Sequence, residues 1–371
     1  MLDQAPIAEG SSGADALGNT LDLARLADRL GYHRYWVAEH HGGPMLASPG
    51  PEVLIGPIAA ATERIRVGSG GVMLPHYSPL KVAESFSMLA GLFPGRIDLG
   101  IGRAPGSDAH TMLALQRDRR EAAPDDFPQQ LAELLGYFED ALPHGHPFAR
   151  YAKWLPGRPH LPEPWLLGSS PQSALWAAEL GLPYAFADFI NGRGADNAHA
   201  YRDRFQPGRR REEPAVAVGI WALAADSDEE AQLLSTSARM SMTLLRQGRL
   251  IEVPPVEKAV RFLESQGTPI DGRPRGRRTI VGTPARVRAG IEETAAEYGA
   301  EEAIVVTITH DHAARRRSYE LIADAFGLEA GGAAPAGVAE DPAGPAGAAA
   351  GAGAAGPAGG RSGQGAVGPA R

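Results

Sequence analysis

An acidic residue and two adjacent histidines follow a run of apolar residues: Glu39, His40 and His41. If that run is a strand, His40 shares a face with Ala38, whereas Glu39 and His41 share the opposite face. An imidazole can accept and return a proton near neutral pH, so His40 is the candidate for general acid–base chemistry. The alternative, that both histidines are structural and bond to loop carbonyls, stays open on the residues alone.

The same histidines do not favour a metal site. They are adjacent rather than spaced as ligands for one ion, and the motif HExxH is absent from the sequence. A second histidine-rich turn, residues 310–312, follows the last predicted strand, and we interpret it as a structural cap of the final helix. A metal-dependent barrel hydrolase is therefore a disfavoured alternative.

Glycines end two neighbouring predicted strands. Gly70 and Gly71 close one of them, where a flexible turn is the simplest interpretation. In the other, Gly100 and Gly102 share a face and would leave room for a planar ring to approach. The glycines from Gly100 onward do not match a dinucleotide fingerprint, because their spacing is wrong and Pro105 falls where a helix should open.

Two groups suited to a phosphate follow strands. Arg103 carries a forked guanidinium that can hold a phosphate through two hydrogen bonds. Ser169, Ser170 and Ser173 occupy a strand-to-helix turn, where hydroxyls and free N–H groups meet the positive end of a helix. A surface ion pair and an ordinary serine N-cap are the alternatives, and the combination favours phosphate.

The rest of the chain predicts parallel βα units, and so a (β/α)8 (TIM) barrel of the α/β class. Only six residues precede the first loop, so the opening strand is expected to be very short. The insertions 104–127 and 247–279 are expected to cover the C-terminal face as lids. The predicted strands are 35–40, 65–74, 96–102, 165–168, 184–187, 215–223 and 303–307, and the predicted helices include 17–30, 53–62, 80–92, 128–142, 171–180, 284–298 and 311–326.

Composition limits the class of partner. The net charge of -8 with scattered Lys and Arg argues against nucleic acid, and the absence of cysteine removes thiol chemistry, so redox chemistry requires a cofactor. We see neither a signal peptide nor a membrane-length apolar run and expect a cytoplasmic protein. Residues 1–329 are the expected barrel domain, and 330–371, rich in Ala, Gly and Pro, a disordered tail.

Several segments together resemble one known family. GYHRYWVAEHH, RIRVGSGGVMLPHYSPLKVAES and FPGRIDLGIGRAPGSD, with WLLGSSPQSALWAAELGLP and DHAARRRSYELIA, are similar in order and spacing to the luciferase-like flavin monooxygenases over residues 1–327. The resemblance implies a catalytic role for His40 beside the flavin and a non-proline cis peptide at Gly70–Gly71 under the flavin ring. The residues that it places against the cofactor are Glu39, Gly70, Gly71, Arg103, Ser169, Ser170 and Ser173.

The resemblance further implies reduced FMN and O2 as reactants with a small organic substrate. We expect a separate flavin reductase to supply the reduced flavin, and we expect a homodimer. Relatives of this barrel also use the deazaflavin F420, so an F420-dependent hydride-transfer enzyme is an alternative. A non-catalytic flavin-binding protein is another.

Overall fold

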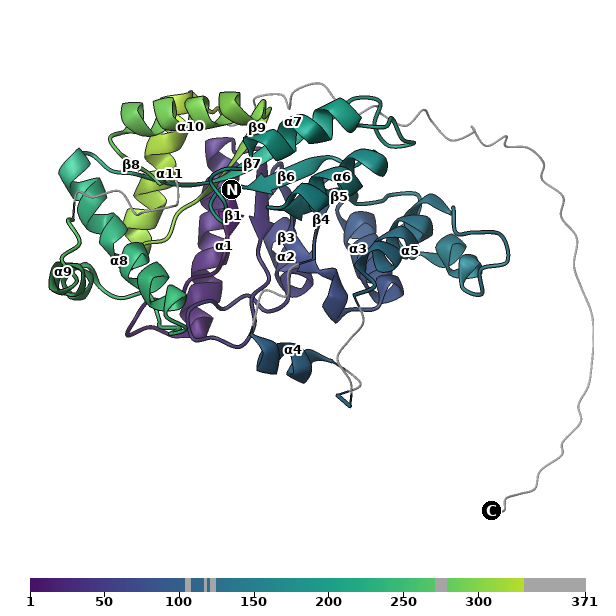
Figure 1. Ribbon diagram of the computed structural model, residues 1–371, viewed down its shortest axis with the longest axis horizontal. Helices are drawn as coiled ribbons and strands as arrows, with labels where there is room; N and C mark the ends of the chain where they lie inside the picture. Colours follow the sequence, from purple (N-terminus) through teal and green to yellow (C-terminus); the bar gives the residue numbers. More distant parts are fainter. Residues whose placement is uncertain (104–107, 117–118, 121–124, 271–278, 330–371) are drawn as a thin grey trace, which may run out of the picture. The chain divides into compact units, whose positions relative to one another are not determined.

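The computed structural model describes residues 1–103, 108–116, 119–120, 125–270 and 279–329. Within these ranges parallel strands alternate with helices (Figure 1). The predicted tail 330–371 lies outside the described residues, as do parts of both predicted lids. The strands are β1 (Leu2–Asp3), β2 (Arg34–Val37), β3 (Arg66–Met73), β4 (Ile97–Gly102), β5 (Glu163–Gly168), β6 (Tyr184–Ala187), β7 (Val216–Ala224), β8 (Ile280–Gly282) and β9 (Glu302–Val306).

The strands pair in chain order from β1 to β7, and every ladder is parallel. β9 then pairs with the first part of β7, while β8 pairs only with its end, at Ala222–Ala224. No ladder among the described residues joins β9 back to β1. The sheet is therefore TIM-barrel-like but open, where we expected a closed barrel of eight strands. β1 has only two residues, and the left-handed Ala5 (φ 48°) follows it closely.

Helices cover the outer face of this sheet (Figure 1). Apolar side chains between helices and strands form the larger core, and a second core fills the inside of the curved sheet around Leu2, Trp36, Trp165 and Trp221. The helices are α1 (Gly13–Leu30), α2 (Pro51–Ala60), α3 (Pro79–Leu92), α4 (Ala109–Leu115), α5 (Phe127–Glu139), α6 (Pro171–Glu179), α7 (Ala195–Arg204), α8 (Asp228–Arg246), α9 (Val256–Ser265), α10 (Pro284–Tyr298) and α11 (His312–Phe326), with 3-10 turns η1 (Leu74–His76) and η2 (Ala149–Trp154).

Charged side chains close the amino end of the curved sheet. The buried Asp98 accepts from Arg34 (2.7 Å) and from Arg66, and also from the indole of Trp36 (2.8 Å). Arg34 additionally holds Glu302 through two bonds of 2.7 and 2.8 Å. Burial alone would raise the pKa of Asp98, but the two guanidinium groups outweigh it and lower that pKa. This network joins the first residues of neighbouring strands, which leaves the carboxyl ends for chemistry.

Candidate active site

His40 lies just beyond the end of β2, at the carboxyl edge of the sheet. Its backbone N–H donates to the carbonyl of Ser48 (2.9 Å), and the Ser48 hydroxyl donates to the carbonyl of Ala38 (2.6 Å). Ser48 is fully buried, so this double link fixes the chain on both sides of the histidine. Nothing in the sequence marked Ser48, because the link joins the strand to a loop ten residues further on.

The imidazole of His40 is largely buried. Its Nδ1 is buried and has no hydrogen-bond partner among the described residues, while part of the ring stays accessible. Burial, with a smaller contribution from the nearby His41, lowers the pKa of His40 to about 4. The ring is therefore neutral near pH 7 and can accept or return a proton.

Glu39 faces away from His40 and into the protein. Its carboxylate accepts from the backbone N–H of Met73 (2.9 Å) and the hydroxyl of Tyr77 (3.0 Å), and it contacts Nε2 of His41 at 2.7 Å. Burial and this carboxylate raise the pKa of Tyr77, which stays a donor. Glu39 was predicted to bind the cofactor, and the structure places it, fully buried, as the support of the turn that follows β3.

The peptide bond between Gly70 and Gly71 is cis, as the resemblance led us to expect. It lies where the pairing of β3 with β4 shifts register. A Cβ on Gly71 would come within 2.8 Å of the carbonyl oxygen of Gly100, and one on Gly102 within 3.1 Å of the sulfur of Met73. The space expected to admit a planar ring at Gly100 and Gly102 is thus occupied by β3, and these glycines are explained by close strand packing.

Arg103 follows β4 and lies over the ring of Trp176 in α6, 5.4 Å from its centroid. Its half-exposed guanidinium also pairs with the carboxylate of Asp125. The stacking on Trp176 keeps the charge beside α6, whose first turn carries the predicted serines. Trp176 was given no role from the sequence, since an isolated aromatic is more often part of a core.

The three serines at the start of α6 have different surroundings. Ser170 is the N-cap and accepts from the N–H of Ser173 (3.4 Å), with Pro171 beginning the helix. The Ser173 hydroxyl points inward, donates to the carbonyl of Ser170 (2.8 Å) and contacts the hydroxyl of Tyr184 (2.9 Å). Ser169 makes no side-chain hydrogen bond within the described part of the chain. The Ser169 hydroxyl is open to an anion, whereas Arg103 would exchange Asp125 for it and Ser170 would exchange a long contact to Ser173 (3.4 Å).

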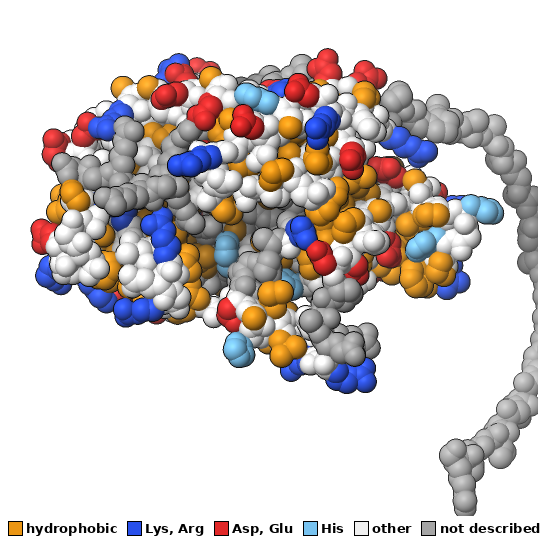
Figure 2. All heavy atoms as spheres, viewed as in Figure 1, with side chains coloured by type: hydrophobic (Ala, Val, Ile, Leu, Met, Phe, Trp, Pro, Cys, Tyr) orange, Lys and Arg blue, Asp and Glu red, His pale blue; other side chains and the backbone are white. Residues whose placement is uncertain are grey.

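The predicted residues converge because β2, β3, β4 and β5 are neighbours in the sheet and end at one edge. Figure 2 shows histidine side chains in the region between α8 and α4. Within the described ranges, no group of three or more His, Asp or Glu side chains could hold a metal ion. None of the described helices is both long and apolar enough to cross a bilayer.

Comparison with known proteins agrees with this arrangement. The family model for luciferase-like monooxygenases matches residues 2–302. The chain belongs to this family. A luciferase-like monooxygenase of Escherichia coli K12 is 44% identical over 327 residues, covering 87% of this chain and 95% of the relative. N-acetyl-S-alkylcysteine monooxygenase of Bacillus subtilis is 38% identical, covering 88% and 97%.

Solved structures share the fold. The crystal structure of apo-MsnO8 has a TM-score of 0.80 and 42% identity, covering 88% of this chain and 98% of that one. More distant structures show the fold alone. One is the oxygenating component of 3,6-diketocamphane monooxygenase from Pseudomonas putida with FMN (TM-score 0.65, 20% identity, 87% and 95% covered). Another is an F420-dependent secondary alcohol dehydrogenase (TM-score 0.59, 14% identity, 84% and 94% covered).

Proposed function

We propose that the chain is an FMN-dependent monooxygenase, which uses reduced FMN and O2 to oxidise a small organic substrate. One observation carries the proposal. The neutral imidazole of His40, with a buried and unpartnered Nδ1, lies at the same sheet edge as Arg103 and the α6 serines, which are suited to bind a phosphate. An unsatisfied buried nitrogen is costly unless something fills its hydrogen bond, which supports a bound ligand at this position.

The chain's own residues would divide the work as follows. Arg103 and the first turn of α6 at Ser169 and Ser170 would bind the FMN phosphate, the arginine through its fork and the helix through its N–H groups. The Gly70–Gly71 segment would lie next to the ring. His40 would hold or return a proton at Nδ1, and Ser48 would keep it in position.

Reduced FMN would supply the two electrons that activate O2, so that one oxygen atom enters the substrate and the other leaves as water. The apolar interior beneath His40, which contains Trp36 and Trp165, would exclude bulk water from the reacting atoms. Reduced flavin would come from a separate reductase, because the sequence offers no fingerprint for a nicotinamide dinucleotide.

The experiment is anaerobic titration of the pure protein with reduced FMN and, separately, with reduced F420, followed by ¹⁸O2 and candidate substrates. The panel includes S-substituted N-acetylcysteines, because a relative is an N-acetyl-S-alkylcysteine monooxygenase. We expect ¹⁸O in the product with FMN, and a loss of about 100-fold or more in rate for His40→Ala, the scale of acid–base catalysis.

Other outcomes separate the alternatives. Binding and turnover of F420 alone would make the chain a hydride-transfer enzyme, whose fold this barrel shares. Tight binding of FMN without oxygen consumption would make it a flavin-binding protein. Rapid NADPH oxidation by the pure protein with FMN would remove the need for a separate reductase.

A further inference from the structure

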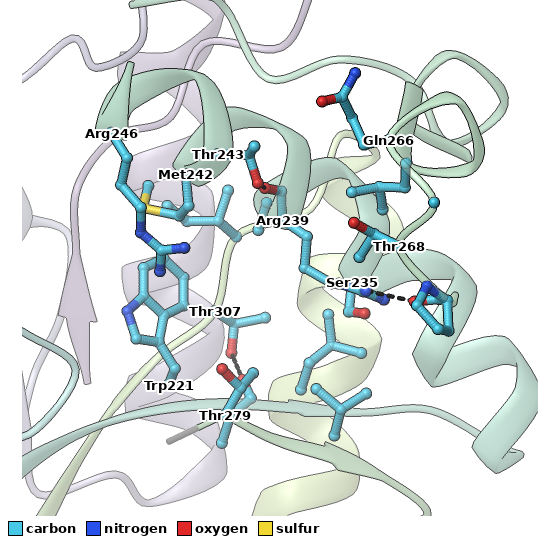
Figure 3. Close-up of a pocket in the computed structure, with 18 residues that line it drawn as sticks. Trp221, Ser235, Arg239, Met242, Thr243, Arg246, Gln266, Thr268, Thr279 and Thr307 are labelled. Atoms are coloured by element: carbon cyan, nitrogen blue, oxygen red, sulfur yellow. Dashed lines mark hydrogen bonds between the residues drawn. The ribbon is translucent and has the colours of Figure 1, made fainter. Parts of the chain in front are cut away.

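A cavity opens at the carboxyl edge of the sheet. It has a volume of about 520 Å³ and lies between α8, the end of α9 and the carboxyl ends of β7 and β9 (Figure 3). That volume is typical of a pocket for a small organic ligand. Trp221 and Ile308 line it and belong to the same interior core as Trp36 and Ala38, which directly precede the site of His40. The cavity is therefore a side chamber of the barrel mouth.

The charge of this chamber is positive. Its described lining contains Arg239 and Arg246 and no carboxylate. Arg239 is buried, and its guanidinium donates to the carbonyl oxygens of Pro269 (2.6 Å) and Ile270. It holds the loop after α9 and is not available to a ligand.

Arg246 is the available cation. It is exposed at the end of α8, and it forms no hydrogen bond or ion pair within the part of the chain that the structure describes. In Figure 3 its guanidinium points from α8 towards the indole of Trp221 and away from Arg239. A guanidinium in this position can hold a carboxylate through two parallel hydrogen bonds.

Three of the hydroxyl groups that line the chamber are already engaged as donors. Ser235 donates to the carbonyl of Gln232 (2.7 Å), Thr243 to that of Arg239 (2.8 Å) and Thr307 to that of Ala222 (2.7 Å). Each of these hydroxyls donates its only proton to a backbone carbonyl, so it can offer a ligand only its acceptor lone pairs. Arg246 is therefore the unpaired guanidinium that the described lining offers to an anion, beside the hydroxyls of Thr268 and Thr279.

We propose that this chamber binds a small organic carboxylate with an apolar body, held by Arg246 through the carboxylate. The apolar body would pack on Trp221, Leu263 and Val281, which line the same cavity. The ligand is the substrate if the proposed monooxygenase function holds, and only this assignment rests on that function. The binding itself stands on the cavity and its charge.

The test uses 4-phenylbutyrate and its uncharged amide, 4-phenylbutyramide, as probes of the same size. Calorimetric titration of the full chain should show the acid binding about ten-fold more tightly than the amide, the effect of a charge-assisted contact. Arg246→Gln should reduce this ratio to about one while retaining amide binding. Arg249→Gln, three residues further and outside the cavity lining, is the matched control and should keep the ratio.

Three results would overturn the proposal. They are equal binding of acid and amide to the natural chain, no binding of either probe, and an unchanged ratio in Arg246→Gln. Titrations with reduced FMN and reduced riboflavin test whether Arg246 binds the flavin phosphate instead of the acid. If Arg246→Gln weakens only FMN and leaves the acid unaffected, Arg246 serves the flavin phosphate, and the proposal is wrong although the monooxygenase function stands.

Discussion

The neutral state of His40 comes from burial and a neighbouring histidine, because no carboxylate faces its ring among the hydrogen bonds of the described residues. A histidine beside a carboxylate would have its pKa raised and would carry a charge near neutral pH. Glu39 is adjacent in sequence but is turned towards Met73, Tyr77 and His41. The protein thus keeps a carboxylate nearby without charging the imidazole.

This state gives a pH dependence of stability. The folded pKa of His40, about 4, is below the ordinary value of 6.5, so between those two pH values the unfolded chain binds a proton that the folded chain does not. Folding stability is full above the ordinary value and falls as the pH decreases, by roughly 1–3 kcal/mol for this group. Denaturant titrations at about pH 7 and about pH 4.5 should show a smaller loss in His40→Gln than in the natural chain. An identical loss in both proteins would contradict the burial of this ring.

The ion pair between Arg103 and Asp125 predicts competition for the phosphate. Both side chains are about half exposed or more, so the pair is worth less than about 1 kcal/mol. Asp125→Asn should therefore tighten reduced FMN binding by roughly two- to five-fold, because Arg103 no longer has a competing carboxylate. Riboflavin, which lacks the phosphate, should bind unchanged, and Asp203→Asn on α7 is the control. Equal gains for FMN and riboflavin would refute phosphate binding at Arg103.

Much of the residue-scale site could be predicted, because each predicted side chain follows a parallel strand. The positions of His40, Arg103 and the α6 serines depend only on that rule. The engagement of Glu39 with Met73 and Tyr77 could not be predicted, since it joins residues more than thirty positions apart. The packing of Gly100 against β3 depends in the same way on the register of two strands.

At the scale of elements, the outcome differs between α8 and α10. The sequence analysis predicted neither this helix nor β8, whereas helix 284–298 was confirmed at both ends. The buried face of α8 carries Ser235, Thr236, Ser237 and Ser241 in place of a continuous apolar stripe. The hydroxyls of Ser235, Thr236 and Ser241 are satisfied by donating to carbonyls within the helix.

Ser237 is the exception on that face and gives a prediction. Its buried hydroxyl has no hydrogen-bond partner within the described residues. Ser237→Ala should raise the free energy of unfolding by about 0.5–2 kcal/mol, because it removes an unsatisfied polar group and adds a better helix former. Ser235→Ala, which removes a satisfied hydroxyl, should give a smaller gain or a loss in the same thermal and denaturant measurements. A destabilised Ser237→Ala would mean that its hydroxyl has a partner in solution.

At the scale of the whole molecule, the two ends of the curved sheet differ in how their polar groups are paired. Asp98, Arg34, Arg66 and Glu302 form a closed network at the amino end, where each charge has a partner. At the carboxyl end, His40 Nδ1 and Arg246 have none among the described residues. Polar groups that the fold leaves unsatisfied at the carboxyl end are groups that a ligand bound there can satisfy.

Exposed apolar side chains on α2 and α3 form a patch on the outer surface, which supports the expected homodimer. The exposed positions along α2 are Val53, Pro57 and Ala60, all apolar and on one side of the helix. The adjoining α3 exposes Met88 and Leu92, of which Leu92 is 68% exposed. Apolar side chains gathered on two packed helices are typical of an interface. We propose that a second copy of this chain covers them.

Light scattering coupled to size-exclusion chromatography should then give twice the mass of one chain. The double variant Val53→Glu with Met88→Glu should give the mass of one chain, because burying two carboxylates without partners costs several kcal/mol. Leu180→Glu changes another exposed apolar residue, at the end of α6, and should leave the dimer intact. Circular dichroism would verify that the double variant is folded. A natural chain that is monomeric at all concentrations, or a folded double variant that remains dimeric, would show that α2 and α3 do not form the interface.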